Sequence, residues 1–485
     1  MKTFTYDGVS CDSMGIRYLT SNITVLPPLS SVTQAVPGRP GAYFYRSDQG
    51  VRQITIDISL PAASVADLRS KARALAAWLQ PSIPKSLVLP DEPDKTYYAV
   101  LDGSTDLTAV AALGSGTLTF TCPDPYAYGA TVTPTIDVTE VNTVANQGTA
   151  EAFPVLTITA QADLEFIAYS NGDDYILLGT PAMADGSQTK VDTNPLVMDD
   201  TCSTITGWNV YNTVEYGTED GTMESDGNHF IASSYGSGSG WHGPSVAKSL
   251  SNTIQDFQVD VWVFNTNTGS KKDMGRVEVY LRDSNGASIG KMSLTDSWNN
   301  DANMWGQVRA GADGTGHNII SEWGDVKGTW NDFYGVLRII RQGNKWTGHI
   351  AKYNSSTAKF YATRTTTWTD TGSSIMNPLA TIQVAVAQYG TNTVTTLQVD
   401  RVQVRDLTTV SDSTTDIPYI AHAGDVIVVD HGAASVTLNG ENAMNIVDPT
   451  STFFSIPANE AVDIDFSPVD SSQMTVSMSY VERWL

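Results

Sequence analysis

Alternation of apolar and polar residues is the dominant pattern along this chain of 485 residues. Between residues 51 and 60, apolar side chains at every second position predict a half-buried β-strand. The same pattern recurs at 256–265, 276–283, 335–353, 381–390 and 395–407. The clearest helical period covers residues 64–79, where Val65, Leu68, Leu75 and Leu79 share one stripe and Ser64 can cap the first turn. The pattern therefore predicts a mainly β protein with one clear helix.

Changes in strand length and composition divide the chain into four segments. Residues 1–129 combine strands with the helix, and Pro123 and Pro125 end the last strand because proline has no N–H for a sheet ladder. Short strands follow in 130–196 and return in 409–485. The segment 197–408 between them has longer strands and nine of the eleven tryptophans.

The segment 130–196 has too few strands to close a sandwich alone. We therefore predict that 130–196 and 409–485 form one sandwich, with 197–408 inserted in one of its loops as a jelly roll. With residues 1–129 as a sandwich plus one helix, the fold class is mainly β with three β-sandwich units.

Charge and cysteine usage exclude several classes of protein. The 52 acidic and 28 basic residues give a net charge of −24, which disfavours binding to nucleic acid. No apolar run reaches the ~18 residues of a membrane span, and the first ten residues lack the apolar core of a signal peptide. Cys11, Cys122 and Cys202 are too widely spaced for a zinc site and are expected to be buried free thiols.

Catalytic patterns are weak. Glu278 and Asp283 fall on opposite faces of their strand, and Glu224 and Asp226 lie in a glycine-containing stretch. The sequence GASIG at 286–290 matches GxSxG, but no helical period follows it, so we predict a hairpin turn. Neither a Walker A loop nor HxxxH spacing is present. We predict that the protein is not an enzyme and has no cofactor, with glycoside hydrolysis as the open alternative.

Aromatic side chains in polar loops point to another chemistry. Three stretches rich in Gly, Ser, Asn or Asp contain tryptophans that no core is expected to surround. Saccharide sites pair aromatic rings, which contact the C–H faces of sugars, with polar partners for the hydroxyls. The predicted carbohydrate-binding residues are Trp241, His242, Trp298, Asn303, Trp305 and Trp323. Trp262, in a strictly alternating strand, is predicted to belong to the core.

Metal binding was weighed for one of these stretches. Asp296, Asn299, Asn300 and Asp301 could supply oxygen ligands to calcium. The DxNxDG loop spacing is absent, and turns rich in Asn and Asp are common without any ion. No metal site is predicted.

Six stretches in order resemble the distal tail proteins of siphoviruses. They are FTYDGVSCDSMGI at 4–16, VPGRPGAYFY at 36–45, ALAAWL at 74–79, LPDEPDKTYYAVLDG at 89–103, FTCPDPYAYG at 120–129 and SYVERWL at 479–485. The resemblance implies that 1–129 is a belt domain that assembles into a hexameric ring. It also implies that 130–196 and 409–485 form a galectin-like sandwich. The insert 197–408 resembles the concanavalin-like carbohydrate-binding module of the "evolved" members of the family.

The function implied by this resemblance is structural and adhesive. The protein is expected in the virion, at the distal end of the tail, as a baseplate hub ring that binds host cell-wall polysaccharide through its insert. Expected partners are further copies of itself, the tail tube protein and a tail-tip or tail-associated lysin protein, with no nucleic acid and no membrane. The alternatives are a tail-associated glycan hydrolase and a purely structural insert without a ligand.

Overall fold

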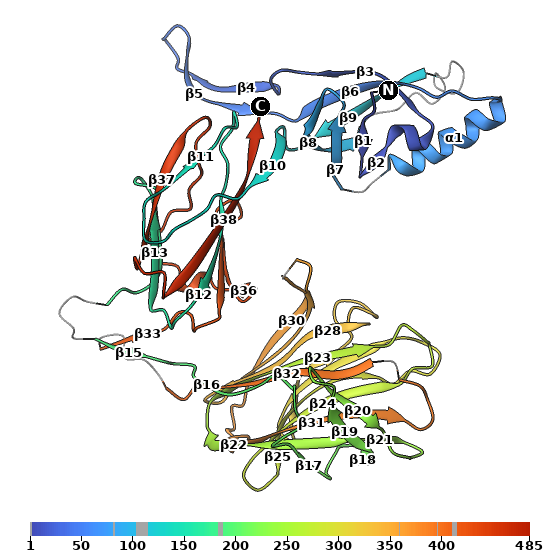
Figure 1. The fold of residues 1–485 in the computed structure, drawn as a ribbon, viewed down its shortest axis with the longest axis vertical. Helices are drawn as coiled ribbons and strands as arrows, with labels where there is room; N and C mark the ends of the chain where they lie inside the picture. Colours follow the sequence, from blue (N-terminus) through green and yellow to red (C-terminus); the bar gives the residue numbers. More distant parts are fainter. Residues whose placement is uncertain are drawn as a thin grey trace. The chain divides into compact units, whose positions relative to one another are not determined.

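A computed structural model describes residues 2–80, 83–102, 115–182, 188–357, 359–394, 396–409 and 415–485. Two compact units are present: Met1–Thr180 with Ile420–Leu485, and Pro181–Tyr419 (Figure 1). Nearly all regular structure in the described residues is β-strand, so the predicted mainly β fold is confirmed. Among these residues, no helix is long and apolar enough to cross a membrane. All three cysteines are buried and free, as predicted.

The N-terminal part of the first unit is a set of strands covered by one helix. Its elements are β1 (Thr5–Tyr6), β2 (Val9–Ser10), β3 (Arg17–Ile23), β4 (Leu29–Ala35), β5 (Ala42–Gln49), β6 (Arg52–Ser59), α1 (Val65–Trp78), β7 (Lys85–Leu89), β8 (Glu92–Leu101), β9 (Ser115–Cys122) and β10 (Ala127–Val132). The predicted cap is present, because the N–H of Asp67 donates to Ser64 Oγ at 3.1 Å. Leu68, Leu75 and Leu79 are buried against the strands, but Val65 is 68% exposed, so the predicted stripe begins one turn later.

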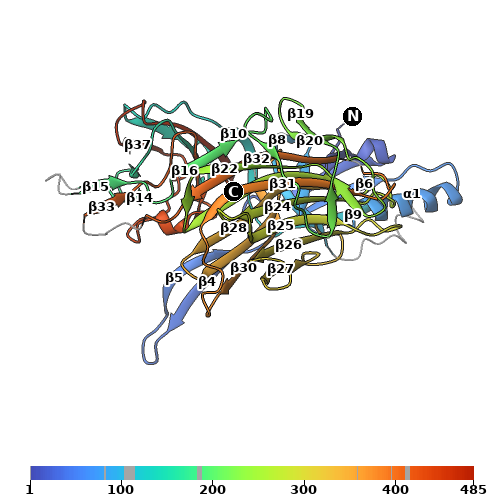
Figure 2. The same cartoon turned by 90° about the horizontal axis from the view of Figure 1, so that it is seen from below.

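The strands β4 and β5 form a hairpin that pairs with no other strand of the described residues. Every residue of β5 is exposed, and so is every residue of β4 except Val32. Large apolar side chains are among them, including Leu29 (55% exposed), Phe44 (63%) and Tyr45 (63%). Figure 2 shows the hairpin extending away from the remaining strands of this part of the chain. A two-stranded hairpin is at best marginally stable alone. The exposed apolar side chains therefore indicate a surface suited to contact with another protein chain.

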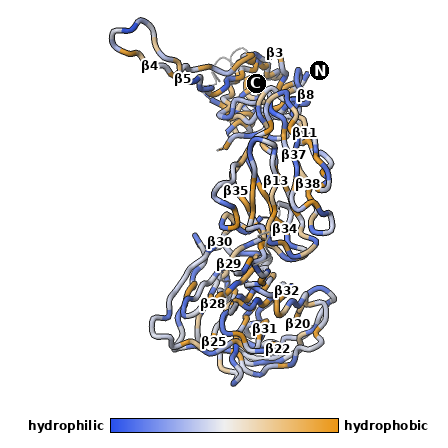
Figure 3. The backbone as a smooth tube through the Cα atoms, turned by 90° about the vertical axis from the view of Figure 1, so that its left-hand side faces the viewer, coloured by the Kyte–Doolittle hydropathy of each residue, from blue (hydrophilic) through white to orange (hydrophobic). Residues whose placement is uncertain are grey.

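The second part of the first unit is a sandwich assembled from two distant chain segments, here called the split sandwich. Its strands are β11 (Asn142–Ala145), β12 (Val155–Ala160), β13 (Phe166–Ser170), β14 (Tyr175–Gly179), β34 (Val426–Asp430), β35 (Ser435–Leu438), β36 (Glu441–Asn442), β37 (Ala461–Ser467) and β38 (Met474–Trp484). β12 lies between β38 and β34, and β13 lies between β37 and β14. Hydrophobic positions recur along strands such as β13 and β38 (Figure 3). One hydrophobic core therefore unites residues from both segments, such as Ile158 and Met478.

A buried histidine lies in the core of the split sandwich. His431 is 4% exposed and contacts the rings of Tyr169 and Phe454. Its Nδ1 accepts the backbone N–H of Phe454 at 2.9 Å, so Nε2 carries the proton and faces Tyr169 Oη at 2.8 Å. Burial lowers the pKa of His431 from 6.5 to about 4, against the opposing effect of Asp430.

Because of this lowered pKa, we expect the split sandwich to lose stability in acid. Between pH 6.5 and about 4 the unfolded chain binds a proton that folded His431 rejects, so the free energy of unfolding falls as the pH falls through this window, by about 3 kcal/mol in total. Thermal melts at pH 7 and 4.5 should show a smaller loss in His431→Gln, which keeps a neutral donor and acceptor, than in the wild type. An equal loss in both proteins would contradict the assignment.

The second unit contains a two-sheet sandwich, here called the inserted sandwich. Its first sheet has eight strands among the described residues: β16 (Leu196–Asp200), β19 (Thr222–Ser225), β20 (Phe230–Ser234), β23 (Phe257–Thr266), β28 (Phe333–Gln342), β29 (Lys345–Asn354), β30 (Lys359–Thr369) and β32 (Thr396–Asp406). The second has nine: β17 (Asn209–Val210), β18 (Gly217–Glu219), β21 (Trp241–Gly243), β22 (Ser245–Ile254), β24 (Gly275–Arg282), β25 (Ser288–Asp296), β26 (Met304–Ala310), β27 (His317–Glu322) and β31 (Leu379–Tyr389).

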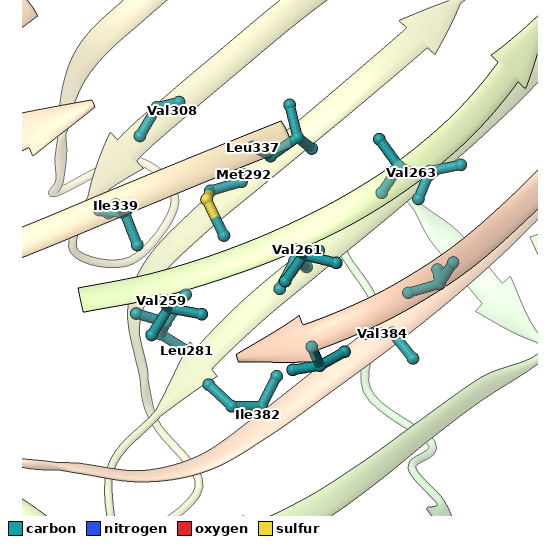
Figure 4. Close-up of a cluster of buried hydrophobic side chains, with 14 of the residues drawn as sticks. Val259, Val261, Val263, Leu281, Met292, Val308, Leu337, Ile339, Ile382 and Val384 are labelled. Carbon is teal, nitrogen blue, oxygen red and sulfur yellow. The ribbon is translucent and has the colours of Figure 1, made fainter. Parts of the chain in front are cut away.

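Aliphatic side chains from both sheets interdigitate to form the core of the inserted sandwich. Figure 4 shows Val261 of β23 and Leu337 of β28 near Met292 of β25 and Val384 of β31. The predicted hairpin turn is confirmed, because the 286–290 stretch lies in the β24–β25 hairpin. A second hairpin joins β28 to β29, with Gln342 opposite Lys345.

The two ends of the inserted sandwich are neighbours. β16, its first strand, pairs with β32, its last, with Leu196 opposite Arg405. Just outside them, β15 (Thr189–Val191) pairs with β33 (Asp416–Pro418). The chain therefore enters and leaves this sandwich at one place, as insertion into a loop requires.

Candidate functional site

One face of the inserted sandwich is polar although it is largely buried. Along β24, Val277, Val279 and Leu281 belong to the core, so the alternate side chains point to the opposite face of the nine-stranded sheet. Cross-strand partners on β25 and β26 share that direction. We call this surface the polar face; it comprises Arg276, Glu278, Tyr280, Lys291, Ser293, Gln307 and Arg309.

Two glutamates and three cations form a connected network on the polar face. Lys291 Nζ lies 2.6 Å from Glu278 Oε1 and 3.1 Å from Glu215 Oε2. Arg276 Nε lies 3.2 Å from Glu278 Oε2, and Arg309 pairs with Glu215. All but Glu215 are at most 5% exposed. Each charge therefore has an opposite partner, as burial requires.

Glu215 belongs to a segment that crosses the polar face and is fastened to it. Arg276 Nη2 donates to the carbonyl oxygen of Glu215 at 2.9 Å, and the backbone N–H of Glu215 donates to Tyr280 Oη at 3.0 Å. Gln383 Nε2 donates to the carbonyl oxygen of Thr213 at 2.8 Å. The segment 213–215 thus covers part of the face and fixes the network below it.

The two carboxylates raise the question of acid catalysis. Both contact the same ammonium group of Lys291, so they are neighbours, as the two carboxyl groups of a glycosidase must be. A general acid needs a raised pKa. Burial acts in that direction on Glu215, but the hydrogen bond from Arg309 and the charge of Lys291 outweigh it and lower the pKa of Glu215. The geometry thus fits a structural ion network better than an acid–nucleophile pair.

A structural role for this network predicts a large loss of stability in Glu278→Ala. The substitution leaves Lys291 and Arg276 buried beside an uncompensated site, which should lower the free energy of unfolding by about 3–5 kcal/mol. The matched control is Glu322→Ala, whose partner Arg364 is 40% exposed, with an expected loss below about 1 kcal/mol. Chemical denaturation measures both. A Glu278→Ala protein as stable as the wild type would indicate that Glu278 is held for chemistry instead.

Two of the predicted saccharide residues meet at one end of the polar face. The rings of Trp305 and Trp323 are 5.0 Å apart and nearly perpendicular. Trp305 points to the polar face because its neighbour Met304 belongs to the core, and it lies opposite Thr295, which in turn faces Arg276. Trp305 Nε1 donates to Ser321 Oγ at 3.3 Å.

Trp241 lies on the same face, on the other side of Arg276. It occupies β21 and packs edge-on against Tyr389 of β31, with ring centroids 5.3 Å apart. The guanidinium of Arg276 lies 4.9 Å from the centre of its ring. Half-buried indoles thus flank Arg276 on the polar face, Trp241 on the β31 side and Trp305 with Trp323 on the β26 side.

The remaining predicted residues lie elsewhere. His242 is 3% exposed, and Trp241–Gly243 is a strand, so the expectation of an open Gly/Ser-rich loop is wrong there. Asn303 is fully buried, and its backbone N–H donates to Asp296 Oδ2 at 3.1 Å, so it is not a surface partner for a sugar. Trp298 is 47% exposed, lies beside Lys327, and makes no contact with the other predicted residues in the described structure.

Sequence reasoning missed the charged members of the polar face. Glu215 and Glu278 come from distant strands and loops, and no spacing along the chain connects them. The alternation of RVEVYLR at 276–282 was a usable signal, because charged residues at its even positions had to share one face.

Asp296, one of the possible calcium ligands, is engaged in hydrogen bonds within the protein. Asp296 Oδ2 accepts from Asn267 Nδ2 at 2.6 Å, and its Oδ1 accepts from the N–H of Trp298 at 3.0 Å. Burial raises the pKa of Asp296 despite these hydrogen bonds. Within the described residues, no group of three His, Cys, Asp or Glu side chains could hold a metal ion.

Family models of phage tail proteins match both ends of the chain. Residues 11–122 match the family model "Phage tail protein RIFT-related domain", and residues 386–484 match "Siphovirus-type tail component, C-terminal domain". The second match begins within β31 and continues through the second part of the split sandwich. No curated protein sequence matched the chain.

Solved structures with a similar fold include two from phages. SPP1 Dit, described as a paradigm of hub adsorption apparatus in phages that infect Gram-positive bacteria, has 10% identity and a TM-score of 0.40, with 100% of both chains covered. The CBM2 module of the evolved Dit of Lactobacillus casei BL23 phage J-1 has 13% identity and a TM-score of 0.39, covering 46% of this chain and all of that one. A legume lectin-like domain of Entamoeba histolytica has 14% identity and a TM-score of 0.28, covering 42% and 91%.

The two family models match the two ends of the chain in the order that the sequence motifs predict. This chain thus carries a phage tail protein domain near its N-terminus and the C-terminal domain of siphovirus-type tail components.

Proposed function

We propose that this protein assembles into a homo-hexameric ring at the distal end of the phage tail and binds host cell-wall polysaccharide through the inserted sandwich. In this role it joins the tail tube protein to a tail-tip or tail-associated lysin protein. Its place is the virion, and assembly occurs in the host cytoplasm. The proposed domain limits are 1–129 for the ring, 130–196 with 409–485 for the galectin-like sandwich, and 197–408 for the saccharide-binding module.

The observation that carries saccharide binding is the polar face with indoles on both sides of Arg276. Trp241, Trp305 and Trp323 supply apolar surfaces for the C–H faces of sugars. Beside them, Gln307 and Thr295 offer amide and hydroxyl groups that can exchange hydrogen bonds with sugar hydroxyls. The charges on this face are paired with one another, which favours a ligand recognised by shape and hydrogen bonds.

The observation that supports assembly is the exposed β4–β5 hairpin. Its aromatic and aliphatic side chains are a large apolar surface that a lone subunit leaves in water. A neighbouring copy of the same domain would bury it, and rotation about one axis repeats that contact until the ring closes. A ring of six weak saccharide sites would raise the affinity for a cell wall by ~10²–10⁴-fold over one site.

Electron microscopy of the purified full-length protein and a glycan array test the two halves of this proposal. We expect six-fold rings and retention of a subset of bacterial cell-wall glycans. Monomers at all concentrations would contradict assembly, and an array on which nothing binds would contradict adhesion.

A second candidate, glycan hydrolysis, is favoured only by the closeness of Glu215 and Glu278. Release of reducing sugar from purified cell walls would support it, provided that Glu278→Gln abolishes the release. We expect no release from either protein.

A further inference from the structure

The opposite face of the inserted sandwich has its own aromatic cluster. Along β23, Val261 and Val263 belong to the core, so Trp262 and Phe264 point outward from the eight-stranded sheet. The prediction that Trp262 is a core residue is therefore wrong, because its half-buried side chain lies on the outer surface. A strictly alternating strand places an aromatic residue on either face, and only the position of the second sheet decides which face becomes the core.

Five rings from four neighbouring strands make up this cluster, which we call the aromatic platform: Trp262, Phe264, Tyr334, Tyr353 and Phe360. The centre of the Trp262 ring lies 5.2 Å from that of Tyr353 and 5.7 Å from that of Phe360. Rings from four strands therefore converge around Trp262, which gives a compact apolar surface on which the C–H faces of sugars can pack.

Polar residues lie two positions away along the same strands and point to the same face of the sheet. Asp260 accepts two hydrogen bonds from Arg338, at 2.6 Å and 2.8 Å, and lies opposite it in the sheet. Arg338 faces His349, whose Nδ1 lies 2.8 Å from Thr365 Oγ1. The platform therefore adjoins carboxylate, guanidinium, imidazole and hydroxyl groups on the same face of the sheet.

Charge decides between classes of ligand. The carboxylate of Asp260 is occupied by Arg338, and at the edge of the face Arg401 pairs with Asp199 through two hydrogen bonds. Within these two ion pairs the charges cancel, which favours a neutral ligand with many hydroxyls. A protein partner would demand a wider apolar surface than one aromatic row beside polar rows.

We propose that the aromatic platform is a second saccharide-binding surface, specific for neutral glycan chains and separate from the polar face. Each subunit then contacts a cell-wall polymer through both sheets of the inserted sandwich. This inference deepens the proposed adhesion but uses none of the residues of the polar face, so the two can fail separately.

The experiment measures binding of the full-length protein to cellohexaose, laminarihexaose and chitohexaose by calorimetry. The platform variant is Trp262→Ala with Tyr353→Ala, and the matched control is Tyr361→Ala, which is 48% exposed beside the cluster and contacts Lys352 instead. We expect at least one hexasaccharide to bind the wild type, the platform variant to bind it about tenfold more weakly or worse, and the control to be unchanged.

Other outcomes separate the two surfaces. If Trp305→Ala with Trp323→Ala abolishes all binding while the platform variant binds like the wild type, the second surface is refuted and the polar face stands. Silence of all three hexasaccharides on the wild type also refutes the neutral-glycan platform. Because the platform variant can lose stability, oxidative footprinting of the unmodified protein provides a second readout. Protection of Trp262 and Tyr353 by the bound hexasaccharide is expected, and unchanged oxidation would overturn the proposal.

Discussion

Removal of the β4–β5 hairpin should convert the assembled protein into monomers. The hairpin shares no strand pairing with the described remainder of the N-terminal strands, so its deletion leaves the core around Ile54, Ile56 and Ile58 intact. Burying an aromatic side chain contributes about 1.5–3 kcal/mol, and Phe44 and Tyr45 are each 63% exposed in the single chain. Since the same contact recurs at every interface of a closed ring, its loss should abolish assembly at micromolar concentration.

Point substitutions distinguish this effect from misfolding. Phe44→Asp with Tyr45→Asp should give monomers that melt at the wild-type temperature of an isolated subunit. The matched control places the same charges on exposed apolar residues of the split sandwich, Val141→Asp with Val469→Asp, which are 62% and 65% exposed. Light scattering coupled to size-exclusion chromatography reports the mass. Rings that persist in the hairpin variant would assign assembly to another surface.

Loss of cell-wall binding should follow from Trp305→Ala with Trp323→Ala. The two rings contact each other at one end of the polar face and offer apolar surface to a sugar. Without them we expect a single site to bind about 10- to 100-fold more weakly, in proportion to about 1.4–2.8 kcal/mol of lost contact. On a ring the loss is larger, because weaker sites also lose the gain from simultaneous contact.

Two control proteins define the role of the rings. Trp305→Phe with Trp323→Phe keeps aromatic surfaces and should recover most of the binding. Trp298→Ala removes a more exposed tryptophan that lies apart from both surfaces, and it should bind like the wild type. If Trp298→Ala binds weakly while the Trp305–Trp323 variant binds normally, the saccharide site lies in the 296–301 turn instead.

Local patterns predicted the elements of this protein well, because alternation and capping are local properties. Ser64 caps α1 through Asp67 as its spacing indicates, and the turns at 286–290 and 342–344 connect paired strands. The mainly β class follows from the same alternation. The sequence alone does not show which outward side chains of a strand remain accessible, because this depends on the segments that pack over the strand. His242 follows Trp241 directly, yet one is buried and the other half-buried.

The candidate site was only partly predictable for the same reason. Composition identified Trp305 in β26 and Trp323 just after β27, and the fold brings their rings into contact. It also suggested Asn303, which the fold buries next to Asp296. The network of Glu215, Lys291 and Glu278 depends on a segment that crosses the sheet, and no pattern within one strand reports such a crossing.

The most direct test of the account compares sedimentation of rings with purified host cell walls, with and without the inserted sandwich. Because Leu196 lies opposite Arg405, residues 196–406 can be replaced by a short linker without separating the strands of the split sandwich. We expect the shortened protein still to form six-fold rings but no longer to sediment with the walls. Shortened rings that bind the walls as strongly as the full-length protein would contradict it.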